Sequence, residues 1–179
     1  MLALIFLITI IMTTYVKVLL LHIWLQWVNC DCYNPLSQLT IKITRPILDP
    51  FRRIFKYSGL WDIIALFIAY IISTISAPIT LQLFRLEPIF FYFGLVILLK
   101  ACGTLVFWVM MSRSLTGWVN YGNNAIDYVL IQLTEPLMIP IRRFISPVSG
   151  VDFSMMVVMM ILYMLNFLGA EYIPGWINF

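Results

Sequence analysis

The sequence predicts an all-α membrane protein with four transmembrane helices in two parallel repeats. Hydrophobic residues make up 63% of the 179 positions and charged residues only 11%, whereas soluble proteins carry about 25% charged residues. A soluble domain of this size could not cover so much apolar surface, and a lipid bilayer removes the need to cover it. In addition, the second half of the chain repeats a pattern of the first half.

Four segments are long and apolar enough to cross a bilayer. They are Met1–Val28, Ile63–Phe84, Pro88–Met111 and Phe153–Ala170. A hydrocarbon core of roughly 30 Å requires about 20 apolar residues, and a single span in lipid must be helical to satisfy its backbone. The first segment contains Lys17 and His22, the third contains Lys100, and the other two contain no charged side chain. The first lacks the basic start and the cleavage site of a signal peptide, so we expect it to be retained.

The two halves share a motif of two prolines and two arginines. Its members are Pro46, Pro50, Arg52 and Arg53, and 90 positions later Pro136, Pro140, Arg142 and Arg143. With residue frequencies of about 5%, chance agreement at four such positions has a probability on the order of 10⁻⁵. We therefore divide the chain into a first repeat, 1–85, and a second repeat, 86–179, which enter the membrane from the same side.

Between the two spans of each repeat lies a shorter stretch with apolar residues at helical spacing. These residues are Leu36, Leu39 and Ile43 in the first repeat, and Ile126, Val129, Leu130 and Leu133 in the second. The spacing predicts an amphipathic helix about three turns long at the membrane interface in each repeat, with Asn34 and Asn124 as the N-caps and Pro35 in first position in the first repeat. We expect it to end or kink at Pro46, and at Pro136 in the second repeat, so that a proline-stiffened loop displays the arginines.

The basic residues predict the orientation of the chain. Seven lysines and arginines lie in the two segments that contain the arginine pairs, and only Arg85 lies on the opposite side. The positive-inside rule therefore places the arginine loops in the cytoplasm and both termini outside. Attraction to anionic headgroups, at about 1 kcal/mol per basic residue, explains the arginines by itself. The repeated proline–arginine spacing favours recognition of a protein partner as the alternative.

Lys17 is the candidate functional residue inside the membrane. It lies ten residues before Trp27, about 15 Å along a helix, and a tryptophan at the interface would place it near the middle of the bilayer. A charge at that depth is costly and indicates function. The alternative is a lysine that snorkels or pairs within the bundle. The spans carry no carboxylate at comparable depth, which argues against a proton relay.

We expect no catalytic, cofactor-binding or metal-binding residues. The sequence has no nucleophile paired with a base, no phosphate loop and no set of metal ligands at the usual spacing. It also lacks a basic stripe with a nucleic-acid motif, so we expect no nucleic-acid partner. His22 and Arg113 hold matching positions before a tryptophan, where both are expected to act as interface anchors.

The repeated unit resembles the YggT family, also called YlmG. The likeness rests on a tryptophan near the end of a span, an Asn-Pro pair, the proline–arginine motif, and a glycine and an aspartate before the next span. The stretch from Gln132 to Leu137 and the stretch from Gly150 to Ser154 are similar to the two-copy form of proteobacteria. The resemblance implies an inner-membrane protein that is not an enzyme. It also implies links with cell division and with osmotic or potassium stress in bacteria, while chloroplast relatives assist haem attachment to a membrane cytochrome.

Together these features predict a multi-pass scaffold or assembly factor of the bacterial inner membrane, linked to cell division or to the biogenesis of membrane complexes. Its arginine loops would bind membrane-protein partners and anionic lipid headgroups, and a homo-oligomer is compatible with the sequence. The alternative is a component of solute or ion transport in the osmotic or potassium stress response, with Lys17 in the pathway.

Overall fold

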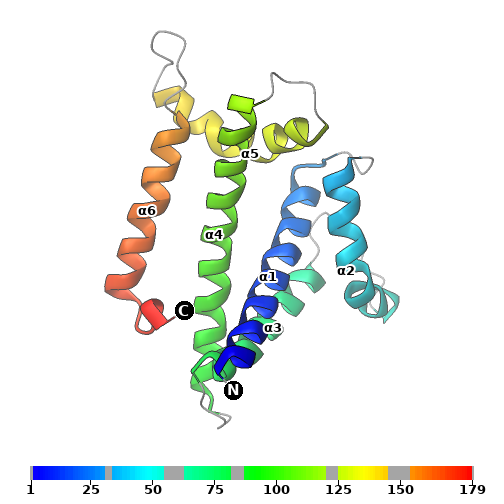
Figure 1. Cartoon of the computed structure of the whole chain (residues 1–179), viewed down its shortest axis with the longest axis vertical. Helices are drawn as coiled ribbons and strands as arrows, with labels where there is room; N and C mark the ends of the chain where they lie inside the picture. Colours follow the sequence, from blue (N-terminus) through cyan, green and yellow to red (C-terminus); the bar gives the residue numbers. More distant parts are fainter. Residues whose placement is uncertain are drawn as a thin grey trace.

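The computed structural model describes residues 2–30, 34–54, 63–81, 87–119, 125–144 and 154–178. These residues form six α-helices and one 3₁₀ turn (Figure 1), so the all-α prediction is confirmed. The elements are α1 (Leu2–Trp27), α2 (Pro35–Ile54), α3 (Ile63–Leu81), α4 (Ile89–Val119), α5 (Ala125–Phe144), α6 (Ser154–Tyr172) and η1 (Trp176–Asn178).

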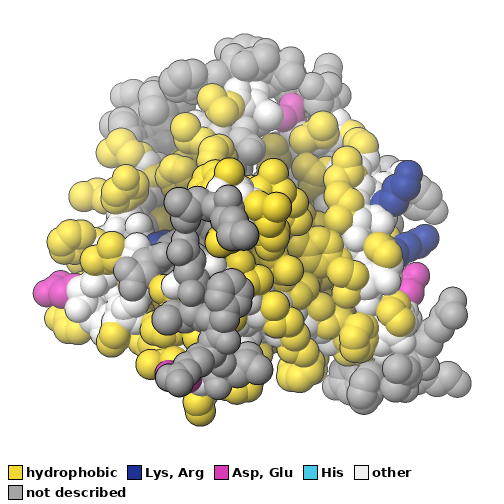
Figure 2. Space-filling model, turned by 60° about the horizontal axis from the view of Figure 1, so that its bottom comes forward, with side chains coloured by type: hydrophobic (Ala, Val, Ile, Leu, Met, Phe, Trp, Pro, Cys, Tyr) yellow, Lys and Arg dark blue, Asp and Glu magenta, His cyan; other side chains and the backbone are white. Residues whose placement is uncertain are grey.

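Helices α1, α3, α4 and α6 are each long and apolar enough to cross a membrane. They direct large apolar side chains outward, among them Phe6, which is 68% exposed, and Phe167, which is 72% exposed. Figure 2 shows hydrophobic side chains over most of the described part of one face. Because apolar surface in water costs about 25 cal/mol per Å², these four helices fit a multi-pass membrane protein, as the sequence predicted.

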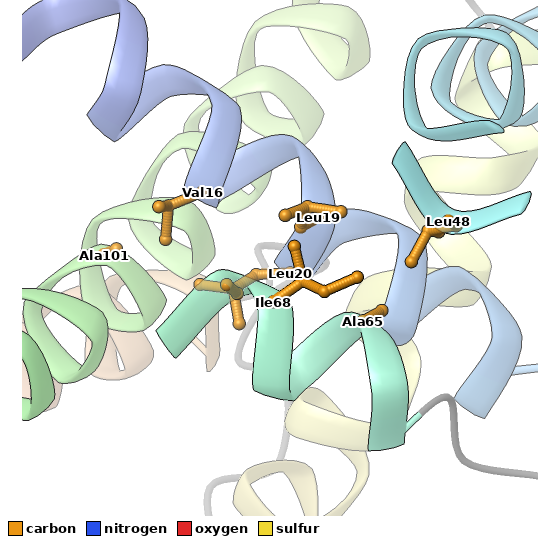
Figure 3. Packing of buried hydrophobic residues seen from close by; sticks show 8 residues of the cluster. Val16, Leu19, Leu20, Leu48, Ala65, Ile68 and Ala101 are labelled. Atoms are coloured by element: carbon orange, nitrogen blue, oxygen red, sulfur yellow. The ribbon is translucent and has the colours of Figure 1, made fainter. Parts of the chain in front are cut away.

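The main core lies where α1, α3 and α4 pack together. Val16, Leu19 and Leu20 of α1 meet small side chains of the neighbouring helices, Ala65 of α3 and Ala101 of α4 (Figure 3). Small residues let helix backbones approach closely, which is how helices in lipid gain van der Waals contact. From the other side, α2 adds a fully buried leucine to this cluster.

Gly94 is the point of closest approach between α3 and α4. A Cβ atom there would lie 2.8 Å from Thr74 Cα and would also meet Thr74 Oγ1. The same approach lets Ser73 Oγ donate to the Gly94 carbonyl at 2.6 Å, and the Tyr70 hydroxyl to the Phe91 carbonyl at 3.0 Å. The glycine therefore both permits the contact and satisfies polar groups of α3 that lipid could not satisfy.

The turn from α1 to α2 uses two asparagines. Asn29 has a φ of 53°, and the Cys30 amide donates to the Leu25 carbonyl at 3.1 Å, a left-handed helix end that asparagine tolerates well. Asn34 then caps α2, since its Oδ1 accepts a hydrogen bond from the Leu36 amide at 3.2 Å. The predicted N-cap is thus confirmed in the first half, while Asn124 lies outside the described residues.

The prediction of proline-stiffened loops was wrong. Both helices continue through their prolines, so Pro46, Pro50, Arg52 and Arg53 lie within α2, and Pro136, Pro140, Arg142 and Arg143 lie within α5. A proline removes one backbone hydrogen bond and crowds the carbonyl four residues earlier. In each helix the two prolines are four residues apart and exposed, so the weakened bonds fall on one outer side while the buried side stays packed. Both helices change direction part-way along instead of ending (Figure 1).

Helices α2 and α5 are placed differently in the bundle. Helix α5 lies across one end of α4 and α6, whereas α2 runs alongside α1 before it turns (Figure 1). On α2, Thr44 and Leu48 are buried, while Lys42 and Arg45 are exposed. The two halves also differ in packing, because α1 and α3 are in close contact along their length, whereas α4 and α6 leave a groove between them.

Two glycines of α4 provide a matched test of this packing. We expect Gly94→Ala to lower the free energy of unfolding by about 1–3 kcal/mol, because the added methyl group overlaps the α3 backbone. Gly103→Ala should be neutral or slightly stabilising, because a Cβ there meets nothing within 4 Å and alanine favours helix over glycine. Thermal unfolding of both variants in detergent measures the difference; equal melting temperatures would contradict the close α3–α4 approach.

Candidate functional site

The proline–arginine motif lies on the outer face of α2 and α5. Its four prolines, Pro46, Pro50, Pro136 and Pro140, are exposed, as are Arg142 and Arg143 in the last turn of α5. Arg52 and Arg53 belong to the last turn of α2, and their side chains lie outside the described part of the structure. The described members of the motif are therefore all exposed, and the arginines lie at the helix end, where the helix dipole favours positive charge.

Lys17 lies in a different place, on the wall of a half-open cavity between α1, α3 and α4 that polar and apolar side chains line together. The cavity has a volume of about 180 Å³. It is lined by Thr9, Thr13 and Lys17 of α1, Thr80 of α3, and Ile97, Lys100, Ala101 and Thr104 of α4. The lining residues of α1 follow one another at intervals of four and so form one stripe of that helix. Lys17 itself is half-buried.

The four threonine hydroxyls of this cavity are bonded to their own helices. Thr9 donates to the Ile5 carbonyl at 3.0 Å and Thr13 to the Thr9 carbonyl at 2.9 Å. Thr80 and Thr104 bond in the same way, each to a carbonyl one turn earlier. This arrangement satisfies a hydroxyl within an apolar helix and leaves its oxygen able to accept a further hydrogen bond.

Lys100 connects this cavity with a second, larger one. Its Nζ donates to the Trp176 carbonyl at 2.9 Å and lies 5.7 Å from the centre of the Trp176 ring. Trp176 is itself held by a hydrogen bond from its Nε1 to Asn166 Oδ1 at 2.8 Å, and it packs against Gly169 of α6. Lys100 thus fixes the C-terminal turn against α4, and the sequence had not indicated this contact.

The larger cavity is the groove between α4 and α6. It has a volume of about 680 Å³, and most of its lining is apolar. Val106, Phe107 and Leu162 contribute to its walls, and Trp176 covers part of it beside Lys100. Among the described residues, no group of three histidine, cysteine, aspartate or glutamate side chains could hold a metal ion.

Comparison with known proteins places these features in a family. The family model described as CCB3/YggT matches residues 1–83 and 92–173. The chain belongs to the CCB3/YggT family. It is similar to a protein of Escherichia coli K12 named "Uncharacterized protein YggT", with 44% identity over 166 residues, 93% of this chain and 88% of the relative. It is also 37% identical over 177 residues to a Vibrio alginolyticus protein, with 96% of each chain covered. No solved structure matches the chain.

The match to the CCB3/YggT family includes both the arginine helices and the Lys17 cavity. Sequence reasoning had singled out Lys17 but missed the threonines beside it. A signal was present, because Thr9, Thr13 and Lys17 repeat at intervals of four along a span. The partners from α3 and α4 had no such signal, since only the tertiary structure brings Thr80 and Thr104 to this stripe.

The expectation of two equivalent interface anchors was wrong for His22. Its side chain is only 4% exposed and lies 3.3 Å from Gln26 Nε2. Arg113 instead reaches from α4 to α5, where its Nη1 donates to Thr134 Oγ1 and approaches Met138 Sδ at 3.0 Å. Thr134 is fully buried, so this arginine anchors α5 to the end of α4.

Removing that anchor should loosen α5. We expect Arg113→Met to lower the free energy of unfolding by about 1–3 kcal/mol, because a buried hydroxyl loses a charged partner. Ser112→Ala is the matched control, since Ser112 is the neighbouring residue and, among the described residues, its hydroxyl donates to the Trp108 carbonyl of its own helix. Limited proteolysis at α5 together with thermal unfolding measures both effects. An unchanged α5 in the Arg113 variant would show that apolar packing alone holds this helix.

Proposed function

We propose that the protein is a non-catalytic scaffold or assembly factor of the bacterial inner membrane. It consists of two repeats, each with two spans and one amphipathic helix that begins at the cytoplasmic interface. Helices α2 and α5 bind membrane-protein partners through their outward proline–arginine faces. This function is consistent with a role in cell division or in the biogenesis of membrane complexes.

The exposed prolines are the observation that carries this proposal. A proline inside a helix costs about 3 kcal/mol or more. Pro46, Pro50, Pro136 and Pro140 are all exposed, so the prolines themselves gain no burial in the described chain, and the packing of the opposite side of each helix offsets their cost. The same spacing occurs in both helices, although α2 and α5 pack differently on the bundle. The prolines of both helices therefore meet a requirement that the packing of this chain does not explain, and binding of a partner to the two outer faces is such a requirement.

The arginines support two kinds of partner on the same surface. Arg142 and Arg143 are exposed at the end of α5, where each could pair with a lipid phosphate or with a carboxylate of another protein. Anionic lipid would hold α5 at the membrane surface and orient its proline face. A protein partner would then dock on that oriented face, so lipid binding and recruitment are compatible steps.

The proposed orientation has a direct test in intact cells. In a background without native cysteines, Ile177→Cys should react with a membrane-impermeant thiol reagent, because the C-terminal turn faces the periplasm. Tyr128→Cys on α5 should react only after the cells are permeabilised. Both positions are strongly exposed, so accessibility of the side chain does not limit the reaction. The reverse labelling pattern would show that the arginine helices face outward.

Site-specific photocrosslinking tests the proposed partner surface. A crosslinker at Ile139, which is exposed beside the proline pair of α5, should yield protein adducts in cells. The same crosslinker at Phe167 on α6 is the matched control and should yield mainly lipid adducts. Replacing Arg142 and Arg143 with glutamine should reduce the protein adducts at Ile139 several-fold at unchanged protein level. Lipid adducts alone at both positions would leave the arginines as membrane anchors and exclude the scaffold role of α5.

Transport of a solute or ion is the second candidate function, and one observation favours it. Lys17 lines a cavity between the spans together with four threonines, and no described carboxylate lines that cavity. An ionisable side chain beside a cavity at membrane depth is typical of transport pathways. A role in osmotic or potassium stress would fit this candidate.

A further inference from the structure

We infer that the cavity between α1 and α4 is a binding site for a small monovalent anion. The inference concerns the interior of the bundle and does not depend on the scaffold proposal, which concerns the outer faces of α2 and α5. It also assigns a ligand class to the cavity on which the transport candidate rests.

The direction of the Lys17 side chain supports this assignment. In an α-helix, side chains lean toward the N-terminus and lie over the preceding turn. This geometry directs Lys17 along its own helix toward Thr13 and Thr9, and Lys17 lines the same space as these two residues. The cavity lies along this path, so a lysine at this position contributes its three N–H donors to the cavity.

The charges around the cavity select the sign of the ligand. Its lining contains two lysines, Lys17 and Lys100, and no described carboxylate. Glu87, before α4, and Glu171, near the end of α6, are exposed at helix ends and do not line the cavity. Charges interact strongly in surroundings of low dielectric constant, so a cation would be repelled by both ammonium groups while an anion would be attracted by both.

The threonines add hydrogen-bond donors without leaving a backbone group unsatisfied. Each hydroxyl now donates to a carbonyl one turn earlier, such as Thr13 to Thr9 or Thr104 to Lys100. Those carbonyls are also the regular acceptors of a helix amide. A hydroxyl can rotate its proton toward an anion, and the carbonyl that it releases keeps its amide partner.

The size of the cavity limits the ligand. A volume of about 180 Å³ corresponds to roughly six water molecules at about 30 Å³ each. A chloride-sized or bromide-sized ion fits with a few of its waters, but a nucleotide or a folded peptide segment does not.

The cost of removing an ion from water rises with the square of its charge, and burial of even one charge is expensive. Lys100 already bonds Trp176, so Lys17 contributes the main positive charge available to a ligand among the described lining residues, and such a site suits a monovalent ion.

Bromide is the probe for this site. The purified full chain in detergent is titrated with sodium bromide against sodium gluconate at constant ionic strength, and the melting temperature is followed. We expect a saturable rise for the native protein, since a ligand that binds only the folded state stabilises it. Lys17→Met should weaken the apparent affinity roughly ten-fold or more, because it removes a charge-assisted contact. Lys42→Met, on the exposed side of α2, is the matched control and should behave as the native protein.

Two further variants keep the test decisive if Lys17→Met does not fold. Lys17→Arg retains the charge and should retain bromide binding. The double variant Thr9→Val with Thr13→Val keeps Lys17 and the shape of α1 but should weaken binding roughly five-fold or more through the lost hydroxyl donors. A bromide response that is the same in all these proteins would reflect a general salt effect and would overturn the site.

Flux measurements in proteoliposomes separate the anion site from transport. Chloride flux that is lost in Lys17→Met would support the site as part of a pathway. Lys17-dependent binding without flux would support a resident anion and remove the transport candidate. Potassium flux that persists in Lys17→Met and is lost in the double threonine variant would overturn the anion assignment. The crosslinking result at Ile139 is independent of all three outcomes.

Discussion

The close approach of α3 and α4 at Gly94 is the constraint on which much of the structure depends. Lipid provides no hydrophobic force between spans, so the helices must gain stability from close packing and from hydrogen bonds that cross between them. Gly94 supplies both, because the missing side chain admits Thr74 and brings Ser73 within reach of a backbone carbonyl. With α4 held in this way, Ala101 also reaches the core that α1 and α3 share.

The position of α4 then determines the position of the second half. With 31 residues, α4 is about 46 Å long at 1.5 Å per residue and extends well beyond a hydrocarbon core of roughly 30 Å. Its extension carries Arg113, which bonds the buried hydroxyl of Thr134 and holds α5 across the bundle. Helix α6 packs against α4 and α5 near Met110 and Met138, and toward its other end the C-terminal turn connects it with α4 through Lys100.

Polar groups inside the spans fall into two kinds. Most serine and threonine hydroxyls bond to their own helix or to the adjacent one, as Ser76 and Thr74 do, and such bonds only make the apolar environment tolerable. The stripe of Thr9, Thr13 and Lys17 differs because it meets polar residues of other helices around an open volume. The two kinds of polar group differ in whether packed side chains fill the space beside them. Beside Ser73 and Gly94 the space is filled, whereas beside Lys17 a cavity remains.

The amino-acid sequence by itself determined the fold class, the four apolar helices, the N-cap at Asn34 and the family, because composition, helical periodicity and motif spacing are local properties of the chain. It also singled out Lys17 as the candidate functional residue within the spans, which stays a prediction. It did not determine the course of α2 and α5 through Pro46 and Pro136, because a proline breaks a helix only when tertiary packing on the opposite side does not hold it. Nor did it reveal the contacts of Arg113 with Thr134 or of Lys100 with Trp176. Residues 21 or 76 positions apart meet only when the helices pack, and that packing also brought the threonines of three helices to one cavity.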